Sequence, residues 1–142
     1  MPIIGISFRS IEADIDIEKK HKGDININSV PTIQKIEKHE LGLANLKEAL
    51  AIDFKFETKY EPKIGNIAIE GRVLYQTNKI KESLEKWKKE KKLDEKLLIE
   101  ILNAIFRKCL VKAVDLSNEL GLPPPIRFPV VKPGKEQKDY IG

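Results

Sequence analysis

The sequence predicts an α+β fold in which a four-stranded antiparallel sheet is followed by two helices, the second of them long. Two observations lead to this prediction. Up to residue 76 the apolar side chains recur mainly at every second position, and from residue 80 they recur at every third or fourth position. The first period is typical of strands with one face on a core, and the second is typical of amphipathic helices. Because all strands precede the helices, we expect the helices to cover one face of the sheet.

Residues 3–17 and 25–41 are the first two predicted strands. In the first, the apolar residues occupy even positions as far as Phe8 and odd positions from Ile11 onward. This change of parity requires the extra residue of a β-bulge. The second strand contains Pro31, which has no backbone N–H to donate to a neighbouring strand. We therefore expect the second strand to lie at a sheet edge or to bend at Pro31.

Residues 49–60 and 67–76 are the third and fourth predicted strands. From residue 50 to residue 60 the even positions carry apolar side chains or Thr58, and the odd positions are charged apart from Ala51. Such alternation places one face of the strand on the core and the other in water. Because only a short reversal separates the third strand from the fourth, we expect them to pair as a hairpin.

Two helices follow, a short one marked by Ile80, Leu84 and Trp87 and a long one over residues 94–120. Asp94 is suited to cap the start of the long helix, and Gly121 is suited to end it. The apolar residues of the long helix form a band wider than one face. A band this wide is compatible with burial against a second protomer as well as against the sheet.

Length and charge favour one domain with a polar tail. We assign residues 1–131 to the domain and residues 132–142 to the tail, in a chain of 142 residues with a net charge of +4. The single cysteine, Cys109, cannot form an internal disulfide. No leader and no apolar run of membrane-spanning length is readable. We therefore expect a cytoplasmic protein without a membrane span.

No pattern in the sequence points to catalysis or to a cofactor. His21 and His39 lie among lysines without a second ligand at metal-binding spacing. Cys109 falls on the apolar band of the long helix, where a thiol packs as a small hydrophobic group. The glycines do not form a phosphate-binding loop. We expect a protein that is not an enzyme and that holds no cofactor and no metal.

Two segments have alternative interpretations. Residues 79–92 hold seven lysines and three glutamates, and this segment is either a solvated helix face or a contact with phosphate or an acidic partner. Trp87 is in register with Ile80 and Leu84, which favours anchoring to the core over stacking on a base. The segment that begins at Pro123 either folds back onto the sheet or forms part of a groove for an extended peptide or a partner subunit.

The C-terminal third resembles the corresponding part of SecB export chaperones. The residues that carry the resemblance are Asn103-x-Ile105-Phe106, then Gly121-x-Pro123-Pro124, and then Phe128-Pro129-Val130. A second stretch, Tyr60-Glu61-Pro62-Lys63-Ile64-Gly65 with Gly71-x-Val73-x-Tyr75, resembles uncharacterised archaeal proteins of the SecB-like kind. The number and order of the predicted strands agree with both.

This resemblance implies an oligomeric chaperone that holds unfolded or nascent polypeptides in hydrophobic grooves and needs no nucleotide. It implies that the chain forms a homo-oligomer in which the long helix packs between protomers. It also implies that aromatic side chains line the grooves. The polypeptide-binding residues predicted in this way are Phe54, Phe56, Tyr60, Phe106 and Phe128.

One departure from the family leads to an alternative function. SecB proteins are acidic, whereas this chain is basic. The alternative is a protein associated with the large ribosomal subunit that binds rRNA through the short helix and the tail. The residues predicted to contact RNA are Lys86, Lys88, Lys89, Lys91, Lys92, Lys132 and Lys135.

Overall fold

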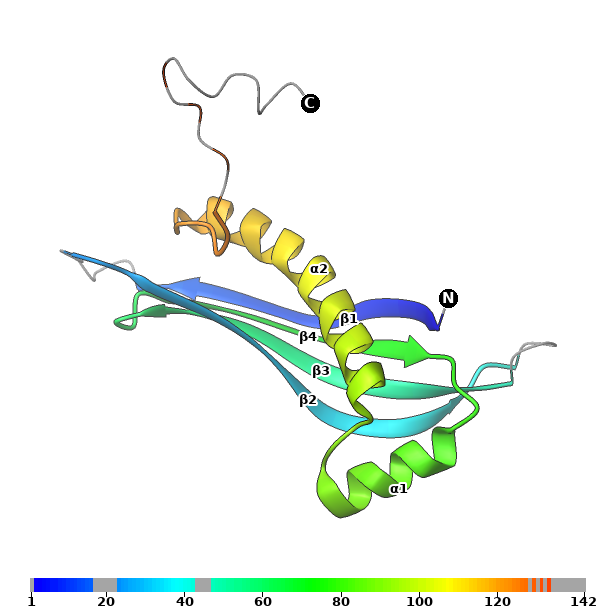
Figure 1. Cartoon of the computed structure of the whole chain (residues 1–142). Coiled ribbons are helices and arrows are strands. Elements are labelled where there is room, and N and C mark those ends of the chain that lie inside the picture. The colour runs from blue at the N-terminus through cyan, green and yellow to red at the C-terminus, as the bar shows by residue number, and fades with distance from the viewer. Residues whose placement is uncertain are drawn as a thin grey trace.

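The computed structural model describes residues 2–16, 23–42 and 47–127 together with Pro129, Val131 and Pro133. In these ranges the chain forms four strands and then two helices, in the predicted order. The elements are β1 (Ile3–Ile15), β2 (Asn26–Glu40), β3 (Glu48–Glu61), β4 (Gly65–Tyr75), α1 (Ile80–Glu90) and α2 (Glu95–Leu120). Figure 1 shows α2 crossing one face of the sheet and α1 beside β2.

The four strands form one antiparallel sheet in the order β1-β4-β3-β2. The predicted hairpin of the third and fourth strands is confirmed by the pairing of β3 with β4. Of the two alternatives for Pro31, the edge position is confirmed, because β2 lies at the end of the strand order and pairs with β3 alone among the described strands. An edge strand tolerates proline because one row of its backbone groups has no ladder partner.

The parity change in β1 is a bulge, as predicted. The register of β1 against β4 shifts between Phe8, which lies opposite Gly71, and Ser10, which lies opposite Glu70. The two strands approach each other closely at this point. A Cβ atom on Gly71 would collide with the carbonyl oxygen of Ser7 and would lie 2.8 Å from Cζ of Phe54. Glycine at position 71 therefore allows both the bulge and the packing of Phe54.

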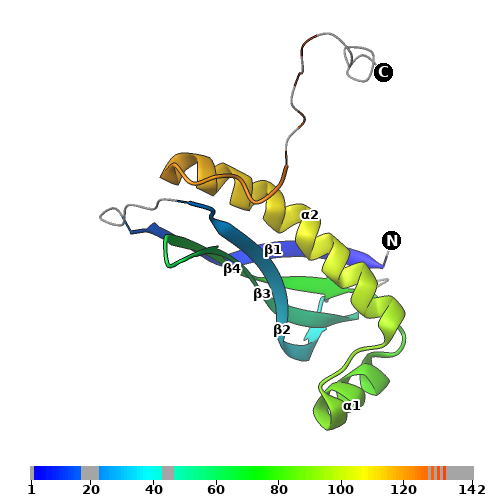
Figure 2. The same ribbon diagram turned by 60° about the vertical axis from the view of Figure 1, so that its left-hand side comes forward.

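The core lies between the sheet and α2, and Figure 2 shows α2 stacked over the strands. The sheet contributes Leu50, Ile52, Phe54, Phe56, Tyr60, Ile67, Ile69 and Val73, and α2 contributes Leu97, Ile101, Ile105, Cys109 and Ala113. The residues of α2 recur at every fourth position, so they form one row along the helix. We name them the core row.

The prediction that the odd positions of the third strand face water is wrong at Ala51 and Asp53. Ala51 has no exposed surface and Asp53 is 4% exposed. The cross-strand neighbours of Ala51 are Glu37 of β2 and Leu74 of β4, which are larger side chains than alanine. Asp53 is enclosed by the arginines that pair with it. Burial on this face therefore comes from neighbouring strands and not from a covering layer.

Both ends of α2 lie within a residue of their predicted positions. Asp94 occupies the N-cap position, but its side chain makes no capping hydrogen bond. Gly121 has a φ of 71°, and its N–H donates to the carbonyl oxygen of Asn118 while the N–H of Leu122 donates to that of Ser117. This pair of bonds is a Schellman motif, in which glycine adopts the left-handed conformation at little steric cost.

The chain turns back onto the sheet directly after α2. Leu122 is buried, and the hydroxyl of Tyr60 donates a hydrogen bond of 2.7 Å to the carbonyl oxygen of Pro123. Leu122 and Pro123 are thus held on the sheet, whereas Ile126 is 39% exposed, so both interpretations of the proline segment stay predictions. Phe128 and Val130 lie outside the described residues. No helix in the described ranges is long and apolar enough to cross a membrane.

Candidate functional site

An apolar groove lies where α1, the start of α2 and the middle of β2 meet. Its volume is about 540 Å³. The groove is lined by Pro31, Thr32, Ile33, Trp87, Lys91, Lys92, Leu93, Glu95, Leu98 and Leu102. We name it the α1 groove. Its walls are mainly apolar, and its charged residues come from the end of α1 and the first turn of α2.

The α1 wall of the groove depends on a shallow docking of that helix. Ile80, Leu84 and Trp87 pack against the core, yet no residue of α1 is fully buried. The expectation that Trp87 anchors the short helix agrees with this packing. Trp87 also lines the groove, because a helix that is held only by half-buried residues leaves part of its apolar stripe uncovered.

The α2 wall is formed by a second apolar row beside the core row. Leu98, Leu102, Phe106 and Leu110 recur at every fourth position and are all half-buried. Leu98 and Leu102 line the groove, and Phe106 lies one helical turn further along. The ring of Phe106 meets that of Phe56 edge to face, with 5.6 Å between the ring centroids. The second row is therefore supported by the core without being enclosed in it.

The predicted polypeptide-binding residues fall into three groups. Phe54, Phe56 and Tyr60 have no exposed surface, so they are core residues and are not available to a polypeptide in this structure. They occupy the inner face of a central strand beneath α2, where no solvent remains. Phe106 is half-buried and lies in line with the groove. Phe128 lies outside the described residues.

The lysines predicted to contact RNA are exposed as far as they are described. Lys86, Lys88, Lys89, Lys91 and Lys92 lie on or directly after α1 and are exposed, whereas Lys132 and Lys135 lie outside the described residues. None of the five forms an ion pair with any residue in the described part of the chain. Their positive charge is therefore not neutralised by the fold.

Lys91 has a defined position at the mouth of the groove. It ends α1 in the left-handed conformation, with a φ of 55°, and its N–H donates a hydrogen bond of 2.9 Å to the carbonyl oxygen of Trp87. Its Nζ lies 5.4 Å from the centroid of the Trp87 ring. A cation at this distance from an indole face is attracted by the ring. The groove therefore has an aromatic wall with a positive charge beside it.

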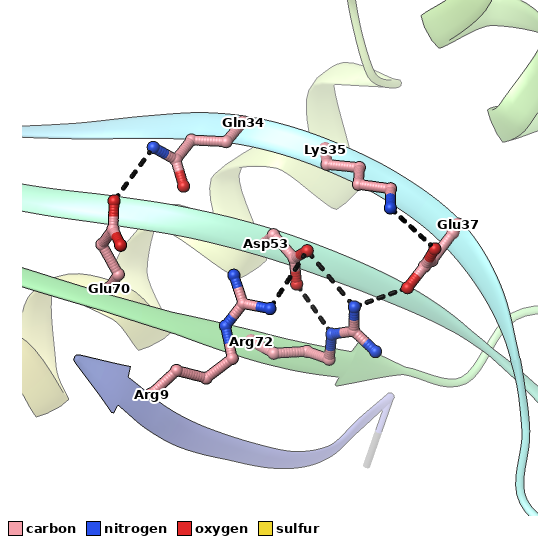
Figure 3. Close-up of polar contacts among 7 residues, drawn as sticks. All are labelled: Arg9, Gln34, Lys35, Glu37, Asp53, Glu70 and Arg72. Atoms are coloured by element: carbon pink, nitrogen blue, oxygen red, sulfur yellow. Dashed lines mark hydrogen bonds and ion pairs between the residues drawn. The ribbon is translucent and has the colours of Figure 1, made fainter.

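The outer face of the sheet carries a network of charged side chains, drawn in Figure 3. Nε of Arg72 donates to Oδ1 of Asp53 at 2.7 Å, Nη2 of Arg72 donates to Glu37, and Nη1 of Arg9 lies 3.8 Å from Asp53. Burial acts to raise the pKa of Asp53, but the hydrogen bond and charge of Arg72 outweigh it, so this pKa lies below its ordinary value. Each buried charge has a partner, which is typical of a structural network.

Reactive groups are scarce in the described ranges. These ranges contain no group of three metal-ligating side chains. Burial raises the pKa of the Cys109 thiol to about 12, so the thiol is protonated at neutral pH, in agreement with the expected packing role. The absence of enzymatic activity and of a cofactor stays a prediction.

The groove is the feature that reasoning from sequence missed. The sequence favours core anchoring of Trp87 over stacking on a base, and it gives Pro31, Ile33, Leu98 and Leu102 no functional role. The available signal was the second apolar row of α2, which the width of the apolar band already contained. No local sequence pattern indicates that β2 lines the groove, because this depends on where α1 docks against the sheet.

The arrangement of sheet, helices and connections defines a SecB-like α+β fold. A solved structure with this fold is the Mycobacterium tuberculosis SecB-like chaperone Rv1957, which was determined in complex with a ChAD peptide from the HigA1 antitoxin Rv1956. The likeness has a TM-score of 0.56 at 13% sequence identity, and it covers 94% of this chain and 91% of that one. No family model and no curated protein matches the sequence. The comparison supports the SecB-like fold, but it does not support the archaeal branch expected from the sequence.

Proposed function

We propose that this protein is a chaperone-type binder that holds unfolded or nascent polypeptides in the α1 groove without using a nucleotide. The observation that carries the proposal is the groove itself, whose walls include Trp87, Leu98 and Leu102, all incompletely buried by the fold. Concave apolar surfaces of this size are typical ligand sites. The likeness to a SecB-like chaperone that was solved with a bound peptide supports the same function.

The size of the groove implies weak and reversible binding. Burial of one large apolar side chain contributes roughly 1.5–3 kcal/mol, so a segment with two such side chains gains about 5 kcal/mol from the groove. Association also costs translational, rotational and side-chain freedom, so the net free energy is smaller than this gain. The Kd of a single segment is therefore weaker than roughly 0.2 mM, and the client is released spontaneously without a nucleotide.

The proposal is tested by the aggregation of a chemically unfolded client, followed by light scattering in the absence of ATP. Full-length protein is expected to suppress the scattering, and Leu98→Gln is expected to lose most of this effect because it places an amide in the groove wall. Ile99→Gln is the matched control, since Ile99 is the next residue of α2, is 51% exposed and does not line the groove.

Unchanged suppression by a folded Leu98→Gln variant would show that the groove is not the site. A wild-type protein that fails with several clients would refute the chaperone function itself. Helical circular dichroism of both variants verifies that they are folded.

Two further expectations from the sequence, oligomerisation and ribosome binding, stay predictions. Assembly through α2 is compatible with the exposure of Val111 on that helix. The ribosomal alternative has no support from the comparisons. We therefore interpret Lys91 and Lys92 in relation to the groove that they line.

A further inference from the structure

The end of α1 combines three features that the fold alone does not require. Lys88, Lys89, Lys91 and Lys92 follow one another within five residues, all exposed and without an ion pair among the described residues. Lys91 and Lys92 line the apolar groove. Lys91 also holds a left-handed conformation in which glycine is the favoured residue.

Like charges at such spacing repel one another, and none of the described carboxylates forms an ion pair with them. Glu95 is the one carboxylate among the residues that line the groove, and it lies in the first turn of α2, where the helix terminus attracts negative charge. The rim of the groove therefore keeps a net positive charge next to apolar walls. Such a rim favours a ligand that brings negative charge to the lysines and an apolar group to the walls.

We propose that the α1 groove selects polypeptide segments in which a bulky apolar side chain is flanked by aspartate or glutamate. The apolar side chain enters between Trp87, Leu98 and Ile33, and the flanking carboxylates pair with Lys91 and Lys92. This inference rests on the proposed function and adds a rule for client choice. Polypeptides with acidic flanks are preferred, and those with basic flanks are disfavoured by repulsion from the same lysines.

The conformation of Lys91 offers a variant that tests the inference. A left-handed residue with a side chain is strained relative to glycine, and Lys63 has the same conformation with a φ of 49°. Lys91→Gly relieves the strain and removes one rim charge. This variant is expected to unfold at a higher temperature than the wild type and to bind acid-flanked segments less tightly. A variant with unchanged affinity would show that the lysine side chain serves no purpose at the rim.

The direct test compares two labelled peptides that share one apolar centre and differ only in their flanks, aspartate in one and lysine in the other. Fluorescence anisotropy with the full chain is expected to give about tenfold tighter binding of the aspartate peptide, because several weak surface ion pairs add up to this difference. The preference is expected to shrink in about 1 M salt, where the screening length falls to roughly 3 Å.

Reversing the charge of one lysine tests whether the rim of the α1 groove causes the preference for the aspartate peptide. Lys92→Glu is expected to reduce the preference for the aspartate peptide by about fivefold. The control is Lys47→Glu, which alters net charge equally at an exposed position outside the groove and is expected to leave the preference unchanged. Equal effects of the two variants would attribute the preference to net charge and would overturn the inference.

The remaining outcomes separate the inference from the function on which it rests. Equal binding of both peptides by the wild type would overturn the charge rule and leave the proposed function in place. Binding of neither peptide would overturn both. A labelled RNA oligonucleotide serves as a third probe. RNA binding that is tighter than that of the aspartate peptide and is lost in Lys92→Glu would assign the lysines to a nucleic-acid interface instead.

Discussion

Asp53 is a charged side chain on the outer face of the sheet, which no helix or strand of the described residues covers there. It is nevertheless 4% exposed, because Arg72 holds both of its oxygens and Arg9 lies nearby. The cost of enclosing the carboxylate is met by hydrogen bonds from a guanidinium, whose planar fork suits a carboxylate. The network thus links β1, β3, β4 and, through Glu37, β2 on the face opposite the helices.

The lowered pKa of Asp53 predicts acid sensitivity. Because this pKa is lower in the folded than in the unfolded protein, the network contributes stability that is fully present above the unfolded value of about 4. This stability is lost as the pH falls through the folded value. The free energy of unfolding, measured by urea titration between neutral pH and about pH 2, is expected to fall less steeply for Asp53→Asn than for the wild type. Equal slopes would show that Asp53 is not responsible.

Gly71 predicts a contrast between two glycines of the same sheet. Gly71→Ala is expected to lower the free energy of unfolding by about 2 kcal/mol, because the added methyl group meets Phe54 and the backbone of β1 at the bulge. Gly5→Ala is the control, since no atom lies within 4 Å of a Cβ at that position. Urea titrations of both variants measure the difference. The same unfolding midpoint for both would contradict the close approach of β1 to β4.

The roles of some single residues could be predicted from the sequence, and those of others could not. The packing role of Cys109 and the helix-ending role of Gly121 could be predicted, because each depends on neighbours within a few positions along the chain. The burial of Ala51 and the pairing of Asp53 with Arg72 could not be predicted. Both depend on the register between strands, which brings residue 53 opposite residue 72.

The two helices are held to the sheet in different ways. All five residues of the core row of α2 are buried, and Ser117 is buried one further step of four residues along the helix. In contrast, α1 has no fully buried residue and relies on Ile80, Leu84 and Trp87 at partial depth. Local stability follows buried apolar contact, so α1 is the element that opens more easily. We therefore expect the α1 wall of the groove to be adjustable.

Hydrogen exchange of the backbone amides measures this difference directly. The amides of α1 are expected to exchange about tenfold faster than those in the middle of α2, after correction for intrinsic rates. Protection in α1 is expected to rise when an unfolded polypeptide is added, because the bound segment covers the wall. Equal protection of α1 and α2 in the free protein would contradict the shallow docking of α1.

The limits of the elements were predicted to within about two residues, for physical reasons that lie in the local sequence. Alternation fixes where a strand runs, and the apolar band with Gly121 fixes the extent of α2. The pairing of β1 with β4 was not predicted, since it joins strands from opposite ends of the sheet-forming region. The α1 groove was missed for the same reason, because β2 and α2 supply walls from residues far apart in the sequence.

In the whole molecule, the ion-pair network and the lysine cluster lie on different elements, the sheet and the end of α1. The ion pairs of the outer face neutralise one another, while the lysines at the end of α1 remain uncompensated among the described residues. The net charge of +4 equals the excess of lysine over glutamate in residues 79–92. The basic character of the protein is therefore concentrated on and directly after α1, and Lys91 and Lys92 bring part of it to the groove.

The most direct test of polypeptide binding in the groove uses the single tryptophan of the chain, Trp87, as a reporter. An unfolded polypeptide without tryptophan is titrated into the full chain, and the emission of Trp87 is recorded while binding is followed in parallel by sedimentation. We predict a saturable blue shift, because a segment in the groove removes water from a half-buried indole. Binding by sedimentation with unchanged Trp87 emission would place the polypeptide elsewhere and would contradict the account.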